Sequence, residues 1–263
     1  MLKRFMTLAL MLLLLQQQNL HAQHLNNPEH KGAYGLSLGI NQGYLKDLNF
    51  SPLNYTTPGY HVGFFLQKQN DQTYWRTALR LDANKLITRS SDRIEPLYLI
   101  PQLEFSWLKK TGIGEAKLNL WLGGELSSQI HYIDWNGQRS FSYMFAHSLS
   151  LQAIGDYRLN DRQHISSAIT VPLLSLLVRP PYSGYDKEVE DNYENHIFRW
   201  LTKGDFTSLN GFFNPKWATT FMHSLSDKYD VSLGYTMRYL STSGDAKFVS
   251  LHNQFTFGIS KKF

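Results

Sequence analysis

Apolar and polar residues alternate with a period of two along most of the chain, in segments that are separated by turn-rich stretches. In the first segment, 34–41, aromatic or aliphatic residues take the even positions and Gly, Ser or Asn take the odd ones. Such alternation predicts strands with one apolar and one polar face. The pattern occurs in ten segments. The expected strands are 34–41, 59–66, 74–82, 97–107, 117–126, 142–156, 163–175, 216–225, 230–240 and 248–263.

The connections between these strands alternate in length. Short turns are expected at 68–72, 109–115, 158–162 and 226–230. Longer links are expected at 43–57, 86–95, 128–140, 176–215 and, least long, 241–247. Short turns at one end and long loops at the other are typical of an all-β, antiparallel up-and-down transmembrane barrel. We expect about ten strands, within a range of eight to twelve. Twelve strands would apply if 176–215 contains two more. An even number of strands places both termini at the short-turn end.

The N-terminus has the features of an export signal. Lys3 and Arg4 precede an apolar run over 5–15, and a small residue, Ala22, lies before the expected cleavage site. A membrane anchor is the alternative, but this run is well short of the ~20 apolar residues that cross a bilayer. We therefore expect a signal peptide over 1–22 and one barrel domain over 23–263.

Composition narrows the chemistry that the chain can perform. The chain has no cysteine, which excludes disulfides, thiolate metal sites and a cysteine nucleophile. Removal of Lys3 and Arg4 with the signal brings the formal charge from +5 to about +3, and no basic run is interleaved with aromatic residues. We expect no nucleic-acid partner, and the scattered histidines indicate no metal site.

The C-terminus carries the most specific resemblance to a known family. Phe255, Phe257 and Ile259 alternate toward a terminal aromatic residue, Phe263, although Lys261 interrupts the alternation. In this the chain resembles the outer-membrane β-barrel proteins of Gram-negative bacteria over nearly all of its mature length. The resemblance implies that these four apolar residues form the signal read by the barrel-insertion machinery, with outer-membrane lipid around the barrel.

Aromatic residues on the apolar faces gather near the strand ends, as the interface girdles of a membrane barrel do. Those beside short turns are Trp75, Trp107, Tyr157 and Phe263, and those beside long links are Tyr60, Tyr143, Trp217 and Tyr239. The alternative is a secreted, soluble ligand-binding barrel with the apolar face inward. The scarcity of charge on the polar faces argues against it.

Charged residues on the polar faces are expected to meet inside the barrel. Arg76, Glu104, Lys117 and Asp156 each lie within a few residues of a short turn, which predicts one ion-pair network near the periplasmic end. A second cluster is expected nearer the outside, from Arg80, Asp82, Glu125 and Arg238. Because about ten strands enclose only a narrow lumen, such a network favours bracing or plugging over conduction.

The sequence offers two candidate active sites. His164 and Ser166 have the His-x-Ser spacing of outer-membrane lipid hydrolases, but they follow a short turn and lie on the polar face. The omptin proteases carry an acidic pair and an Asp-His pair at the outer rim. The acidic stretch 186–194, with His196, is interpreted here as a solvated loop.

The longest link, 176–215, is the most promising functional segment, because long loops in compact folds are often functional. It offers Tyr193, Phe198 and Trp200 for contact with a protein or small-molecule partner. We expect a structural, binding or narrow transport protein without catalytic activity or cofactor. A barrel enzyme acting on membrane lipid is the alternative.

Overall fold

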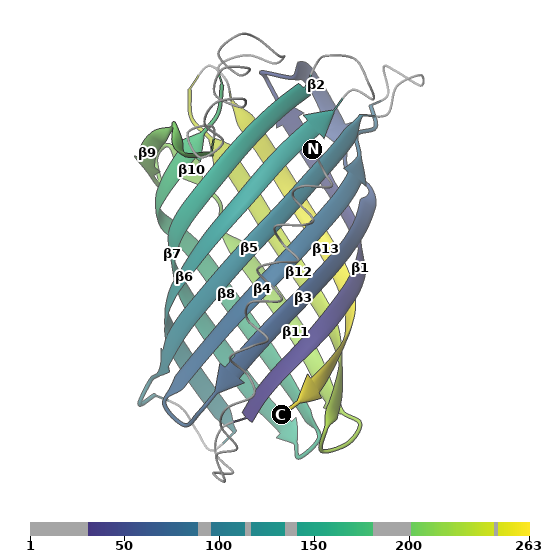
Figure 1. Cartoon of the computed structure of the whole chain (residues 1–263), viewed down its shortest axis with the longest axis vertical. Helices are drawn as coiled ribbons and strands as arrows, with labels where there is room; N and C mark the ends of the chain where they lie inside the picture. The colour runs from purple at the N-terminus through teal and green to yellow at the C-terminus, as the bar shows by residue number, and fades with distance from the viewer. Residues whose placement is uncertain (1–30, 89–95, 114–116, 135–140, 181–200, 245–246) are drawn as a thin grey trace. The chain divides into compact units, whose positions relative to one another are not determined.

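The computed structural model describes residues 31–88, 96–113, 117–134, 141–180, 201–244 and 247–263, so the expected signal peptide lies outside the described residues. Ten long strands form the barrel (Figure 1). They are β1 Lys31–Asp47, β3 Gly59–Gln69, β4 Thr73–Lys85, β5 Leu97–Lys110, β6 Leu118–Asp134, β7 Phe141–Asn160, β8 Gln163–Val178, β11 Lys216–Ser224, β12 Tyr229–Thr242 and β13 Phe248–Lys262. The ten expected strands are confirmed, although β1 and β6 run further into their long links than the alternation indicated.

Every pairing between neighbouring strands is antiparallel, and β1 pairs with β13 to close the sheet. The closure reaches the last residue. The backbone N–H of Phe263 donates to the Gly32 carbonyl at 2.8 Å, and that of Gly32 donates to the Phe263 carbonyl at 2.9 Å. A Cβ on Gly32 would stand 2.5 Å from the Phe263 ring, so glycine lets the terminal ring lie over the first strand.

Three short strands lie at the end of the barrel where the long links are, called here the loop end; the opposite end is the turn end. β2, Ser51–Thr56, pairs with β1. β9, Asp205–Ser208, pairs with the part of β8 that lies closer to the loop end than the part paired with β11. β10, Phe212–Phe213, pairs with β12. The described part of the stretch 176–215 thus contains two extra strands, but neither spans the length of the barrel, so the barrel has ten strands and not twelve.

The two faces of the strands are segregated as the alternation predicted. Leu36, Leu38 and Ile40 point outward and are 55%, 61% and 60% exposed, whereas Glu104 and Glu125 are buried. A wall of exposed leucine is stable only against hydrocarbon, so the barrel spans a bilayer and the soluble-barrel alternative is wrong. No helix among the described residues is long and apolar enough to cross a membrane.

The expected aromatic girdles are largely on the outer surface. Trp107, Tyr157 and Phe263 are exposed at the turn end, and Tyr60 and Tyr239 are exposed toward the loop end. The other three residues of the two girdles differ in exposure: Trp217 is exposed, Trp75 is half-buried and Tyr143 is buried. Tyr143 is only 7% exposed, because it packs with Phe145 and Val178 in a cluster that Leu201 also contacts.

We predict that Leu38→Arg lowers the free energy of unfolding in lipid vesicles by about 2–4 kcal/mol, because it places a charge against hydrocarbon near mid-membrane. The matched control is Leu225→Arg, since Leu225 is equally exposed but lies between β11 and β12 at the turn end. Urea titration followed by tryptophan fluorescence measures both. Equal effects of the two substitutions would contradict the placement of the apolar wall.

Candidate functional site in the barrel lumen

A layer of charged side chains crosses the middle of the lumen. Its members are Arg80 on β4, Glu104 on β5, Glu125 on β6, Lys216 on β11 and Arg238 on β12. Strand alternation directs each of them inward, and all five are at least largely buried. Because β11 is separated from β6 by β7 and β8, the lysine meets the two glutamates across the lumen and not along the wall. We call these five residues the charge layer.

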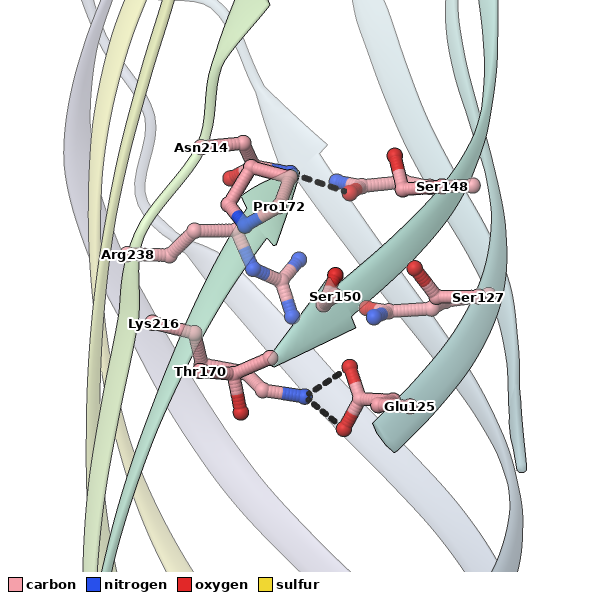
Figure 2. A pocket seen from close by; sticks show the side chains of 11 residues that line it. Glu125, Ser127, Ser148, Ser150, Thr170, Pro172, Asn214, Lys216 and Arg238 are labelled. Carbon is pink, nitrogen blue, oxygen red and sulfur yellow. Dashed lines mark hydrogen bonds and ion pairs between the residues drawn. The ribbon is translucent and has the colours of Figure 1, made fainter. Parts of the chain in front are cut away.

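Lys216 is the centre of the charge layer. Its Nζ lies 2.5 Å from Glu104 Oε1 and donates to both carboxylate oxygens of Glu125 at 3.0 Å (Figure 2). Arg80 holds the other oxygen of Glu104, with Nη2 to Oε2 at 3.1 Å. The layer therefore joins strands on opposite sides of the barrel through buried, charge-assisted hydrogen bonds.

Neutral polar side chains complete the hydrogen bonding of the two glutamates. Gln102 Nε2 donates to Glu104 Oε1 at 2.6 Å. Gln152 Nε2 donates to Glu125 Oε2 at 2.8 Å and is 3.0 Å from Thr170 Oγ1. Buried charges are tolerated when they are both paired and hydrogen-bonded, and this layer satisfies both conditions for its carboxylates.

The Arg238 guanidinium points into a small cavity beside Lys216, where Figure 2 draws no bond to it. The cavity measures about 10 Å³, which is room for roughly one water molecule. Gln129 reaches the same space; its Oε1 accepts from Asn214 at 3.2 Å, while its buried Nε2 has no partner among the described residues. The cavity beside the charge layer thus has space for a single small guest.

A second layer closes the lumen toward the loop end. It is a buried apolar cluster, called here the apolar plug, in which every member is at most 2% exposed. Its members are Leu45, Tyr55, Leu86, Tyr98, Ile100, Ile133, Met144, Ala146, Phe212, Leu240 and Phe248. Phe212 comes from β10, so a short strand that pairs with β12 at the loop end also contributes a side chain to the interior.

An ion pair covers the apolar plug. The Arg179 guanidinium pairs with Asp47, and its carbon lies 5.4 Å from the centre of the Phe248 ring. Ser142 donates to the other Asp47 oxygen at 2.9 Å. These contacts join the end of β8 to β1, β7 and β13 across the mouth of the barrel.

The structure does not bring Arg76, Glu104, Lys117 and Asp156 together, and no ion pair links any two of them in the described part of the chain. Arg76 lies 4.7 Å from the centre of the Phe65 ring, and Asp156 accepts from Trp121 Nε1 at 3.0 Å. The expected single network is corrected: equal distance from a turn does not mean equal depth, because tilted strands are staggered. The second expected cluster supplies Arg80, Glu125 and Arg238 to the charge layer.

The other candidate residues are placed as follows. Ser166 lies opposite Asp156 in the β7–β8 pairing, and His164 lies on the same inward face near the turn end. Phe255, Phe257, Ile259 and Phe263 all point outward. Tyr193, Phe198 and Trp200 lie outside the described residues.

Sequence reasoning missed Lys216, and it expected Asp82 in the second cluster, whereas Asp82 is hydrogen-bonded within a separate polar group near β1. In that group, Ser37, His61 and Asp82 are joined by hydrogen bonds. Lys216 could have been found from the alternation along β11, because it occupies the same face of the strand as Ala218 and Thr220, which is the polar face. No group of three or more His, Cys, Asp or Glu suited to a metal ion occurs in the described ranges.

No family model and no curated protein matches this chain. Among solved structures, the outer membrane protease OmpT from Escherichia coli matches with a TM-score of 0.55 and 10% identity, over 92% of this chain and 99% of that chain. The transport unit of the autotransporter AIDA-I from Escherichia coli gives 0.47 and 10%, over 93% and 94%. The translocator domain of NalP from Neisseria meningitidis gives 0.40 and 9%, over 97% and 96%. At this identity the likeness to OmpT concerns the fold alone.

We predict that Lys216→Met lowers the free energy of unfolding by about 3–5 kcal/mol, because it leaves two buried carboxylates without their shared cation. Adding Glu125→Gln to that variant should restore part of the loss. Lys228→Met is the matched control, since Lys228 is exposed in the turn between β11 and β12. Urea unfolding in lipid vesicles measures all three, and a loss no larger than that of Lys228→Met would contradict the role of the charge layer.

Proposed function

We propose that this chain, which has the fold of the Gram-negative outer-membrane β-barrels, is a non-conducting scaffold that binds a partner at its loop end. The observation that carries the proposal is the closure of the lumen at two successive depths, by the charge layer and by the apolar plug. The proposal joins the structural and binding roles expected from the sequence.

The apolar plug supports a closed lumen directly. Tyr98, Phe212 and Phe248 are each 1% exposed, so water does not reach their side chains from either end. A barrel of about eight strands is just filled by its side chains, and ten strands add little room. A plug of this kind excludes hydrated ions, because an ion that crossed it would lose its hydration shell and would meet only apolar groups in exchange.

The charge layer supports bracing rather than selectivity. A selectivity filter binds an ion in transit and releases it, which requires charged groups that face an open path. Lys216 instead has its ammonium held by two carboxylates, at 2.5 and 3.0 Å. Its hydrogen-bonding capacity is used within the protein, so narrow transport is the less favoured role.

Proteolysis is not part of the proposal. OmpT is a protease, but the similarity to it is one of fold, and the acidic stretch 186–194 of this chain lies outside the described residues. Outer-membrane lipid is proposed to surround the barrel and to contact its exposed apolar side chains. Phe255, Phe257, Ile259 and Phe263 are proposed as the signal for the barrel-insertion machinery, supported by their outward direction on β13.

Binding at the loop end is proposed for the link 176–215. Both described parts of the link are fixed to the barrel: Arg179 pairs with Asp47, and the Leu201 carbonyl is 3.0 Å from His147 Nε2. Between them the sequence supplies Tyr193, Phe198 and Trp200, residue types that are enriched at binding surfaces. A protein or a small molecule at the cell surface is the proposed partner.

We predict that the purified barrel gives no steady current in a planar lipid bilayer, because the two layers leave no aqueous path. An open porin reconstituted in the same bilayer serves as the positive control, and protease protection in vesicles confirms that the barrel has inserted. Reproducible open-channel steps from the inserted barrel would contradict the proposal and favour narrow transport.

We predict that deletion of residues 183–200 leaves a folded barrel but abolishes co-purification of a surface partner, because it removes the three aromatic residues and spares Leu201 and β9. Deletion of the turn residues 226–228 at the opposite end is the control. Cross-linking on intact cells followed by mass spectrometry measures the partner. The same partners recovered from wild type and from the 183–200 deletion would contradict the assignment.

A further inference from the structure

Three neighbouring strands place a hydroxyl, an imidazole and a carboxylate in a hydrogen-bonded row inside the barrel. Ser37 Oγ on β1 is 3.2 Å from His61 Nε2 on β3. The other ring nitrogen, Nδ1, is 2.7 Å from Asp82 Oδ1 on β4. A hydroxyl on one imidazole nitrogen and a carboxylate on the other is the arrangement by which serine hydrolases activate a nucleophile, and it is recognised by geometry rather than by order in the chain.

The carboxylate of the row is firmly held. Gln254 Nε2 donates to Asp82 Oδ1 at 2.9 Å, and His252 Nε2 lies 3.5 Å from Oδ2. A buried acceptor of this kind favours the imidazole tautomer with the proton on Nδ1. In that tautomer His61 Nε2 has a free lone pair and accepts the proton of the Ser37 hydroxyl.

A glycine lets the hydroxyl and the imidazole lie close to the backbone of β3. Gly63 is the β3 partner of Ser37 and at the same time the β3 partner of Arg80. A Cβ at Gly63 would stand 2.5 Å from Ser37 Oγ and 2.8 Å from His61 Nε2, so a side chain there would displace the Ser–His pair from its place against the β3 backbone. Arg80 itself is paired with Glu104 at 3.1 Å, and its side chain is 16% exposed.

The turn-end half of the lumen is less tightly filled on this side. The inward-facing residues Ser37, Thr220, Ser232 and Thr256 are only partly buried, and glycines occupy positions between them. The loop end is closed by the apolar plug. A small solute would therefore reach Ser37 from the turn end, which faces the periplasm.

We propose that Ser37, His61 and Asp82 form a second, catalytic site that hydrolyses small carboxylic esters entering from the periplasmic side. Ser37 Oγ attacks the ester carbonyl carbon while His61 Nε2 takes the hydroxyl proton and then delivers it to the departing alcohol. Water, with its proton taken by the same nitrogen, cleaves the acyl–Ser37 bond, releases the acid and restores the hydroxyl. Asp82 is the positioning residue that holds the ring and stabilises its protonated form.

This site differs from the His-x-Ser pair of the sequence. Ser166 lies opposite Asp156 in the β7–β8 pairing, and no hydrogen bond joins its hydroxyl to an imidazole in the described part of the chain. Ser166 therefore lacks the imidazole base that the Ser37 hydroxyl has. His164 and Ser166 thus provide an internal comparison within the same lumen.

The test is covalent labelling of the folded, full-length barrel with diisopropyl fluorophosphate. A bond forms between Ser37 Oγ and phosphorus, fluoride leaves, and His61 takes the hydroxyl proton. We expect one adduct per chain, located at Ser37 by peptide mass spectrometry. We expect no adduct in Ser37→Ala, labelling at least about 100-fold slower in His61→Gln, and unchanged labelling in the Ser166→Ala control.

Mapping the adduct on the unaltered chain needs no variant, so it decides the question even where a substitution prevents folding. The pH profile of labelling adds a readout that a purely structural hydrogen bond would not move: the rate should rise as a histidine loses its proton and should lose this dependence in His61→Gln. An unlabelled barrel beside a fully labelled reference hydrolase, an adduct at another residue, or labelling independent of His61 would overturn the proposal.

Discussion

Every other feature of this chain depends on one constraint, that a sheet in hydrocarbon cannot leave an edge unpaired. Each unsatisfied backbone group would cost several kcal/mol in lipid, so the sheet must close on itself. Here β1 and β13 meet over fifteen consecutive residue pairs, from Ala33 with Lys262 to Asp47 with Phe248. The bonds between Gly32 and Phe263 extend the closure to the last residue. Closure then divides all side chains between lipid and lumen.

The lumen that closure creates is filled by two kinds of interaction that respond differently to substitution. The apolar plug gains stability from area removed from water, which is distributed over many contacts. The charge layer depends on Lys216, whose loss leaves carboxylates buried without a partner. The layers also differ in origin: the plug uses residues from the short strands and loop-end positions, whereas the charge layer uses the long strands alone.

The fold could be predicted from the sequence because its signal is local. Parity along each segment identified the ten strands, and the alternation of link lengths identified the two ends. The interior could not be predicted in the same way. The contacts between inward side chains across the lumen depend on strand tilt and stagger. For this reason the sequence predicts that Glu104 pairs with Arg76 and Lys117, whereas in the structure it pairs with Arg80 and Lys216. The burial of Tyr143 on the outer surface could not be predicted for the same reason, because it depends on contacts with residues distant in sequence such as Val178 and Leu201.

The polar interior has a reason beyond stability, because replacing a buried ion pair by apolar residues is often neutral or stabilising. β7 runs over twenty residues, Phe141–Asn160. If its inward positions, which now include Ser148, Ser150 and Gln152, were apolar as well, the strand would read as a continuous apolar run of the length that crosses a membrane as a helix. A chain bound for the outer membrane must first pass the inner one without being retained there. Alternating polar residues prevent retention, and the folded barrel must then satisfy them internally, which is why buried amides, hydroxyls and paired charges fill this lumen.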